Sequence, residues 1–163
     1  MKIWECLVQK STLKKNKFVF VYVMQKSDLL YDKALEIAKK YDLTILSISM
    51  VENDRKLGKD MRGASVEDFL WMIKNAEYVI TNSFHGIMMS LRFHKEFYWA
   101  FQQGAHMSNP RFQMLIDDYG IDKCCCNNVD QSKLAYKIID EKMESQRHQS
   151  IINLRNYNRL LES

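Results

Sequence analysis

The chain has 163 residues, of which 47% are hydrophobic and 27% are charged, a composition that fits one globular domain with an apolar core. Its formal net charge of +4 is spread along the sequence, so it gives little support for nucleic-acid binding but is compatible with a small anionic ligand. No stretch matches a signal peptide or the roughly 18 apolar residues of a membrane helix, and the expected location is the cytoplasm.

The first predicted elements are two strands around a helix. Residues 18–25 form a continuous apolar run, typical of a strand that is buried on both faces of a parallel sheet. The following segment, up to residue 41, places its apolar residues on one helical face behind a cap at Ser27 or Asp28. Residues 43–49 then predict a second strand.

The second half of the chain continues this alternation. After a polar loop, Ser65 is the expected cap of a helix, with Asp68 at the position of a capping-box acid. The remaining predicted elements are a strand at 77–81, a short helix at 86–93, a strand at 96–101, a helix from Pro110 behind an Asn109 cap to Gly120, and a helical region from Asp130 onward.

The alternation of strands and helices predicts an α/β fold with a doubly wound, Rossmann-like parallel sheet. We expect one domain over residues 1–163, in which residues 1–17 lead into the first strand and residues 130–163 form the helical end. Three of the four cysteines are consecutive (Cys124 to Cys126), and adjacent cysteines rarely form disulfides. We expect reduced thiols, no metal site and no cofactor, because neither a CxxC pair nor a carboxylate cluster is present.

The loop TNSFHG, residues 81–86, is the first candidate site, because ligands of open α/β sheets bind beyond the carboxyl ends of the strands. A helix that starts near Gly86 would direct backbone N–H groups at a phosphate or carboxylate, and Gly86 would let the ligand approach the backbone. Asn82 and Ser83 add neutral hydrogen-bonding groups, and His85 adds an imidazole, a side-chain type with an ordinary pKa near neutral pH. Spacing alone favours the plainer interpretation that Asn82 or Ser83 caps the helix, since Ser and Asn are the usual cap residues.

Other cationic side chains follow the predicted strands. His106 lies after the fourth strand, on the expected ligand side, and is a secondary binding candidate. Arg55 or Arg62, in the polar loop after the second strand, could reach an anion, although a mobile loop explains them better. His94 is expected at the opposite end of the sheet, as a surface or turn residue.

Residues 65–101 (SVEDFLWMIKNAEYVITNSFHGIMMSLRFHKEFYWAF) resemble the polysaccharide pyruvyl transferase family. Its pattern is a helix that ends in an Ala-Asp/Glu pair, a strand that ends in Ile-Thr, and then Ser-Phe-His-Gly. Residues 109–121 (NPRFQMLIDDYGI) are similar to the Arg-aliphatic-x-x-Leu-Leu-x-x-x-Gly-Leu segment of the family, and residues 14–25 resemble the stretch that enters its second domain. Glu96 replaces the usual family proline, and larger members carry an N-terminal Rossmann-like half before this region.

The resemblance implies the C-terminal, donor-side half of a glycosyltransferase-B-like fold. The implied reaction transfers a pyruvyl group from phosphoenolpyruvate to a pair of sugar hydroxyls in cell-surface polysaccharide synthesis. It implies that His85 is the acid/base group or contacts the leaving phosphate. Ser83 and the Gly86 amide would bind phosphate oxygens, and Arg111 would hold the phosphate or the carboxylate.

The implied partners are therefore phosphoenolpyruvate and a sugar or glycan acceptor, with a homo-oligomer or a further N-terminal domain as possible complements. Two other functions stay open. One is half of a nucleotide-sugar glycosyltransferase, which uses the same edge of the sheet. The other is a non-catalytic domain that binds an anion or a protein partner.

Overall fold

The computed structural model describes residues 3–9, 11, 13, 16–51, 57–101, 110–128 and 133–161, in two compact units, Met1–Lys133 and Leu134–Ser163. The elements of the first unit are α1 (Ile3–Val8), β1 (Phe18–Val23), α2 (Asp28–Tyr41), β2 (Thr44–Ser49), β3 (Lys59–Asp60), α3 (Val66–Asn75), β4 (Tyr78–Thr81), α4 (Phe84–Arg92), β5 (Glu96–Trp99), α5 (Pro110–Tyr119) and the short 3₁₀ helix η1 (Ile121–Cys124). The second unit contains α6 (Tyr136–Leu161).

A five-stranded sheet in the order β3-β2-β1-β4-β5 forms the centre of the first unit. Every neighbouring pair is parallel, and β1 lies between β2 and β4, with Val19 beside Ile45 on one side and Tyr78 on the other. The order 3-2-1-4-5 is a Rossmann-like winding that runs outward in both directions from β1 and β4. The predicted α/β fold with a parallel sheet is confirmed.

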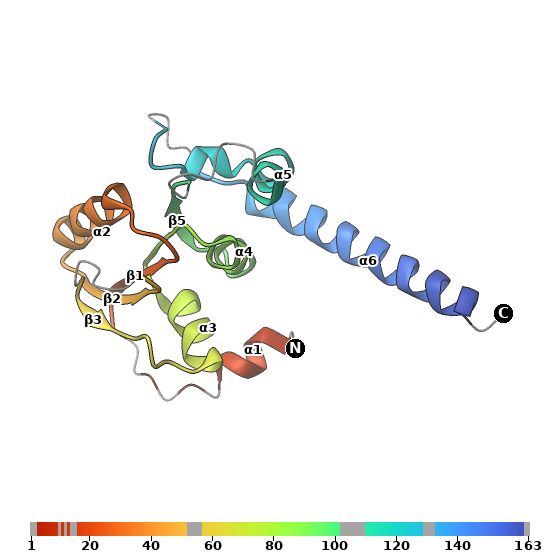
Figure 1. Ribbon diagram of the computed structural model, residues 1–163, viewed down its shortest axis with the longest axis horizontal. Coiled ribbons are helices and arrows are strands. Elements are labelled where there is room, and N and C mark those ends of the chain that lie inside the picture. Colours follow the sequence, from red (N-terminus) through yellow and green to blue (C-terminus); the bar gives the residue numbers. More distant parts are fainter. Residues whose placement is uncertain are drawn as a thin grey trace. The chain divides into compact units, whose positions relative to one another are not determined.

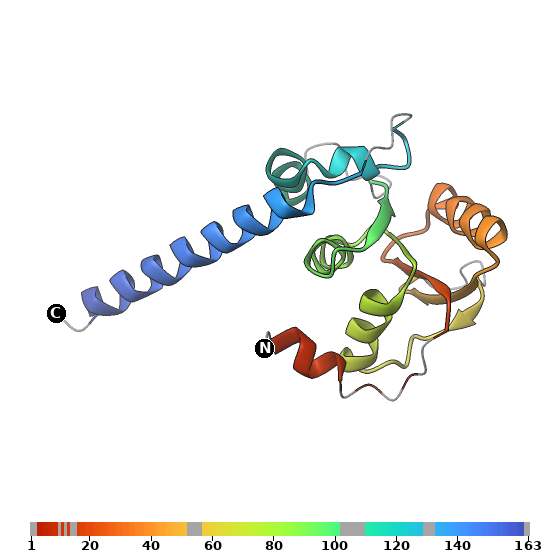
Figure 2. The ribbon, with the colours of Figure 1, turned by 180° about the vertical axis from the view of Figure 1, so that it is seen from behind.

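Helices lie on both faces of this sheet (Figures 1 and 2). Helix α2 covers one face, where Val19, Val21 and Val23 of β1 are in its apolar cluster. On the other face Phe18 of β1 stacks on Trp71 of α3, with ring centroids 5.9 Å apart, and α3 packs beside α1 and α4. Strand β1 is therefore buried on both faces, as its continuous apolar sequence predicts.

Several helices begin or end at the residues that the sequence predicts. Ser27 caps α2, and the hydroxyl of Ser65 caps α3 by accepting a hydrogen bond from the Asp68 N–H at 3.1 Å. Helix α5 begins at Pro110, and Gly120 follows its end in the left-handed conformation with φ 64°.

The structure differs from the prediction in three elements. Helix α1 and the two-residue strand β3 were not predicted, because segments this short carry no measurable periodicity. Helix α4 starts at Phe84, two residues before the predicted start at Gly86. The expected cap Asn109 and the expected helix start Asp130 lie outside the described residues.

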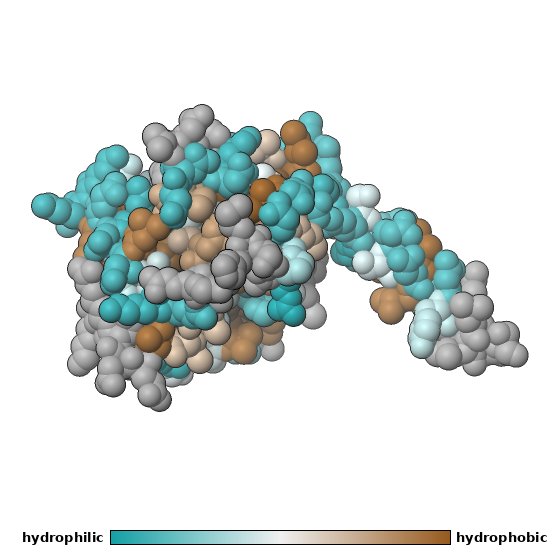
Figure 3. All heavy atoms as spheres, turned by 45° about the horizontal axis from the view of Figure 1, so that its top comes forward, coloured by the Kyte–Doolittle hydropathy of each residue, from teal (hydrophilic) through white to brown (hydrophobic). Residues whose placement is uncertain are grey.

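Helix α6, in the second unit, has 26 residues. Among its exposed apolar residues are Ile138, Leu154 and Tyr157, and Figure 3 shows a mostly hydrophilic helix with separate apolar residues. In the described part of the chain, no helix is both long enough and apolar enough to cross a membrane.

Candidate functional site at the carboxyl edge of the sheet

The winding of the sheet places two loops side by side at the carboxyl ends of β1 and β4. These strands are neighbours, but the chain leaves β1 for α2 on one face and leaves β4 for α4 on the other (Figure 1). Such a topological switch point is where open α/β sheets form their ligand crevice. The predicted candidate loop, residues 81–86, is one of these two loops.

The backbone of this loop is fixed by Thr81 and Ser83. The Thr81 hydroxyl donates a hydrogen bond to the Tyr22 carbonyl at 2.6 Å and accepts one from the Ser83 N–H at 3.0 Å. Ser83 is buried, with 3% of the residue exposed. Its hydroxyl accepts a hydrogen bond from the Gly86 N–H at 3.5 Å, and Ser83 is the N-cap of α4. The capping interpretation of Ser83 is therefore correct, and it places the positive end of α4 at this edge.

Gly86 is buried in the first turn of α4, against the Thr81 side chain. A Cβ added to Gly86 would lie 2.5 Å from Thr81 Oγ1 and 3.1 Å from both of its carbon atoms. Packing between helix and strand is thus sufficient to require glycine here, in addition to the ligand approach that the sequence suggests.

Asn82 joins the two loops of the switch point. Its side chain is fully buried; Oδ1 accepts from the Met24 N–H and Nδ2 donates to the Gln25 carbonyl, each at 2.7 Å. Because both ends of the amide are bonded to the loop after β1, this contact sets the spacing of the two loops.

His85 has the opposite environment. It is exposed on the first turn of α4, and its ring meets the Phe84 ring edge to face with centroids 5.8 Å apart. The imidazole is therefore accessible to a solute that binds at the positive end of α4.

Lys26 is a cation at this edge that sequence reasoning missed. It is exposed, and it lies between Gln25, whose carbonyl is held by Asn82, and Ser27, which caps α2. The sequence shows that Lys26 follows a strand. It does not show that this strand lies beside β4. That neighbourhood is what places Lys26 at the switch point.

The start of α5 contributes Arg111. Trp99, the last residue of β5, stacks on Phe112 with centroids 5.5 Å apart, so the first turn of α5 lies beside the end of β5. Arg111 is exposed in that turn. His106 lies outside the described residues.

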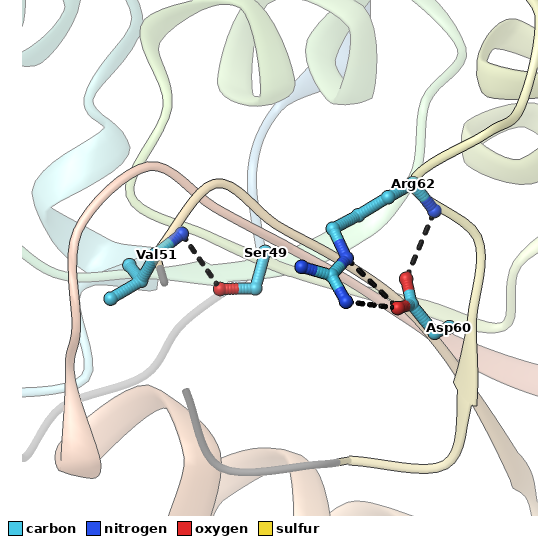
Figure 4. Close-up of polar contacts among 4 residues, drawn as sticks. All are labelled: Ser49, Val51, Asp60 and Arg62. Atoms are coloured by element: carbon cyan, nitrogen blue, oxygen red, sulfur yellow. Dashed lines mark hydrogen bonds and ion pairs between the residues drawn. The ribbon is translucent and has the colours of Figure 1, made fainter. Parts of the chain in front are cut away.

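Arg62 already has a strong ion-pair partner. Its Nε and its terminal nitrogen donate to Asp60 Oδ2 at 2.8 and 2.6 Å, and its backbone N–H donates to Oδ1 at 3.0 Å (Figure 4). Figure 4 also shows Ser49 accepting from the Val51 N–H, a turn at the end of β2. Asp60 compensates the charge of Arg62, which makes this residue a weaker anion ligand than Lys26; Arg55 lies outside the described residues.

His94 is exposed in the turn after α4, with φ 52°, at the opposite end of the sheet from the loops, so its predicted position is confirmed. Among the described residues, no group of three or more His, Cys, Asp or Glu side chains is arranged to hold a metal ion.

A family model described as polysaccharide pyruvyl transferase matches residues 3–100. No curated protein matches the chain, and neither does a solved structure. The match includes the loop at residues 81–86 and the loop that contains Lys26, whereas Arg111 and α6 lie beyond it. The chain belongs to the polysaccharide pyruvyl transferase family.

Proposed function

We propose that the first unit is the donor-binding half of a glycosyltransferase-B-like polysaccharide pyruvyl transferase. Its donor would be phosphoenolpyruvate and its acceptor a pair of hydroxyls on a sugar of a cell-surface polysaccharide. The observation that supports this proposal best is the loop at residues 81–86. It belongs to the family match and presents exposed His85 over the capped start of α4, at the switch point of the sheet.

The charges of the donor fit this edge. Phosphoenolpyruvate carries a phosphate and a carboxylate, which need positive partners. In the proposal Lys26 and Arg111, both exposed at the carboxyl edge, bind these two groups as cations. The phosphate lies at the positive end of α4, where the Ser83 hydroxyl accepts from the Gly86 N–H and keeps its own proton to donate to a phosphate oxygen.

The proposed role of His85 follows from the proton balance. One acceptor hydroxyl adds to C2 of the donor while the vinyl CH₂ takes up a proton and becomes CH₃. The second hydroxyl then displaces the phosphate at C2, which leaves with the second hydroxyl proton and yields a pyruvate ketal. An imidazole near neutral pH can deliver the first proton or accept one from an attacking hydroxyl.

Asn82, predicted as a substrate-binding residue, has its amide bonded to the neighbouring loop. In the proposal it therefore acts as a positioning residue, which keeps Lys26 and His85 on facing loops.

Ligand-dependent thermal unfolding tests this proposal. A ligand that binds only the folded state stabilises it according to its concentration over Kd, by about 2.7 kcal/mol at 100 Kd. We expect phosphoenolpyruvate to stabilise the wild type, and Lys26→Gln and His85→Ala to reduce that shift. Lys39→Gln, a change of equal charge at an exposed site on α2, should retain it.

The other outcomes separate the alternatives. Stabilisation by nucleotide sugars but not by phosphoenolpyruvate would indicate a glycosyltransferase half. An absence of response to phosphoenolpyruvate, phosphate and nucleotide sugars would favour a non-catalytic partner domain. Catalysis is tested by phosphate release in the presence of an acceptor half, where an unchanged rate in His85→Ala would exclude the acid/base role.

A further inference from the structure

A hollow of about 680 Å³ lies on the α3 face of the sheet, over β2 and β3. Helix α3 packs over β1 through Trp71 and Phe18, but β2 is less covered: Thr44 is exposed and Leu46 is half-buried. The volume is within the range of small-molecule sites, roughly 300–1,000 Å³.

The walls of the hollow are apolar, with polar groups among them. Phe18, Leu46, Met61 and Trp71 supply large apolar side chains from four different elements or loops. The segment before β1 contributes Leu13 and Asn16. Lys59 adds an ammonium group.

The segment before β1 is itself anchored. The Ser11 hydroxyl donates to Asp68 Oδ1 of α3 at 2.7 Å, which holds this wall against the helix.

This hollow is separate from the crevice at the carboxyl edge. Phe18 and Thr44 are the first residues of β1 and β2, whereas Asn82 and His85 follow the end of β4. Because all strands are parallel, the hollow lies over the amino-terminal half of β1 and β2, whereas the candidate loops lie at the carboxyl ends of β1 and β4. A ligand of the hollow would therefore not occupy the proposed donor site.

Lys59 gives the hollow its charge. It is paired in register with Leu46, so both side chains are on the same face of the sheet. Successive residues of a strand point to opposite faces, and the carboxylate of Asp60, the next residue, is bonded to Arg62 (Figure 4). Within the described ranges, Lys59 has no ion-pair partner.

We propose that this hollow binds a small amphipathic organic anion. Its apolar body lies against Trp71 and Leu46, and its single carboxylate, sulfonate or phosphate end lies next to Lys59. Burial of the apolar body supplies most of the affinity, since the free energy gained is roughly proportional to the apolar area removed from water. The exposed Lys59 ammonium selects the anion.

Two dyes with the same apolar body test the proposal. 8-Anilino-1-naphthalenesulfonate carries one negative charge, and N-phenyl-1-naphthylamine lacks it. We expect saturable 1:1 binding of both to the full chain, with the anionic dye bound more tightly. Lys59→Gln should weaken the anionic dye by about two- to fivefold, the effect of one exposed ion pair, and leave the neutral dye unchanged.

Two further variants locate the bound dye. Lys39→Gln removes the same charge from exposed α2 and should change neither affinity. Leu46→Glu places a carboxylate beside Lys59 and should abolish binding of the anionic dye. Near-UV circular dichroism confirms that each variant is folded, because the anionic dye also binds loosely packed states.

Several results would overturn the proposal. One is an absence of saturable dye binding to the wild type, and another is an equal effect of Lys59→Gln and Lys39→Gln on the anionic dye. Displacement of the dye by phosphoenolpyruvate would place it at the carboxyl edge instead. A dimer in sedimentation equilibrium that excludes the dye would assign the hollow to a second copy of the chain. Apart from that displacement, these results leave the proposed donor site untouched, because donor binding is measured separately with phosphoenolpyruvate.

Discussion

At the end of β4, two adjacent side chains hold the candidate site in different ways. Thr81 fixes the backbone of its own loop and fills the space beside Gly86, and Asn82 reaches across to the loop after β1. Both residues are fully buried, whereas His85, two residues after Ser83, is exposed. The loop thus combines a rigid base with one accessible imidazole, as a binding site requires.

Gly86→Ala should destabilise the protein by about 1–3 kcal/mol, because the new methyl group overlaps Thr81 Oγ1 in a packed region. Gly63→Ala is the matched control: nothing lies within 4 Å of a Cβ at Gly63, so a change within about 0.5 kcal/mol is expected. Urea unfolding measures both variants. Equal losses for the two glycines would contradict the packing argument.

Asn82→Leu should cost about 2–4 kcal/mol, because it leaves the Met24 N–H and the Gln25 carbonyl without their buried partner. Asn75→Ala removes a single side-chain hydrogen bond, to the Trp71 carbonyl at 2.9 Å, at a partly buried position, and should cost about 1 kcal/mol. Chemical denaturation of the two variants checks the order. If Asn82→Leu were no more damaging than Asn75→Ala, the link between the loops would be dispensable.

At the scale of elements, β3 depends on one glycine. Gly58 precedes this two-residue strand with φ 61°, and a Cβ there would overlap the Ile45 carbonyl oxygen and side chain in β2. Gly120, after α5, has nearly the same φ of 64° but open space, with the nearest atom of Asp122 at 3.9 Å. The two positions separate backbone strain from steric overlap.

Gly120→Ala should therefore cost about 1 kcal/mol, the price of a left-handed residue with a side chain. Gly58→Ala should cost clearly more, because strain and overlap add and the pairing of β3 with β2 is disturbed. Thermal unfolding of both variants tests the difference. A Gly58→Ala protein as stable as Gly120→Ala would show that β3 moves away from Ile45 without loss.

At the scale of the whole first unit, the cysteines beside β5 connect stability to pH. Burial, the main cause, raises the pKa of Cys124 and of Cys126 to about 12 from the ordinary value of 9.0. The backbone of this segment is bound to β5: the Cys126 N–H donates to the Trp99 carbonyl at 2.8 Å, and Cys125 forms an isolated parallel β-bridge with Trp99. These thiols thus keep their protons in the folded chain at a pH where exposed thiols have lost them.

Stability should therefore be independent of these thiols below pH 9 and fall as the pH rises from 9 to 12, because the folded chain then binds more protons than the unfolded chain. Urea unfolding at pH 8 and pH 10.5 measures the loss. It should be smaller in a double Cys124→Ala, Cys126→Ala variant and unchanged in Cys6→Ala, which alters α1 instead. An equal loss in all three proteins would assign the pH dependence to other groups.

Elements whose signals are local could be predicted from the amino-acid sequence. The apolar run of β1, the serine caps of α2, α3 and α4, and Pro110 with Gly120 around α5 each depend on residues a few positions apart. From these follow the alternation of strands and helices, the parallel sheet and the loop that contains His85. The family resemblance, which rests on the same contiguous words, was also readable from the sequence.

Which loops face each other could not be predicted, because it depends on the order of the strands in the sheet. Asn82 bonds to Met24 and Gln25, which are 58 and 57 residues away, because β1 and β4 are neighbours in the sheet. The pairing of β1 with β4 brings Lys26 to the site. In the same way, the short segment β3 becomes a strand because it pairs with β2, and this pairing places Lys59 at the hollow. Local patterns specify which segments become strands. The order of the strands is set by the packing of helices on both faces of the sheet, which joins residues that are far apart in the sequence and is therefore not contained in any short window.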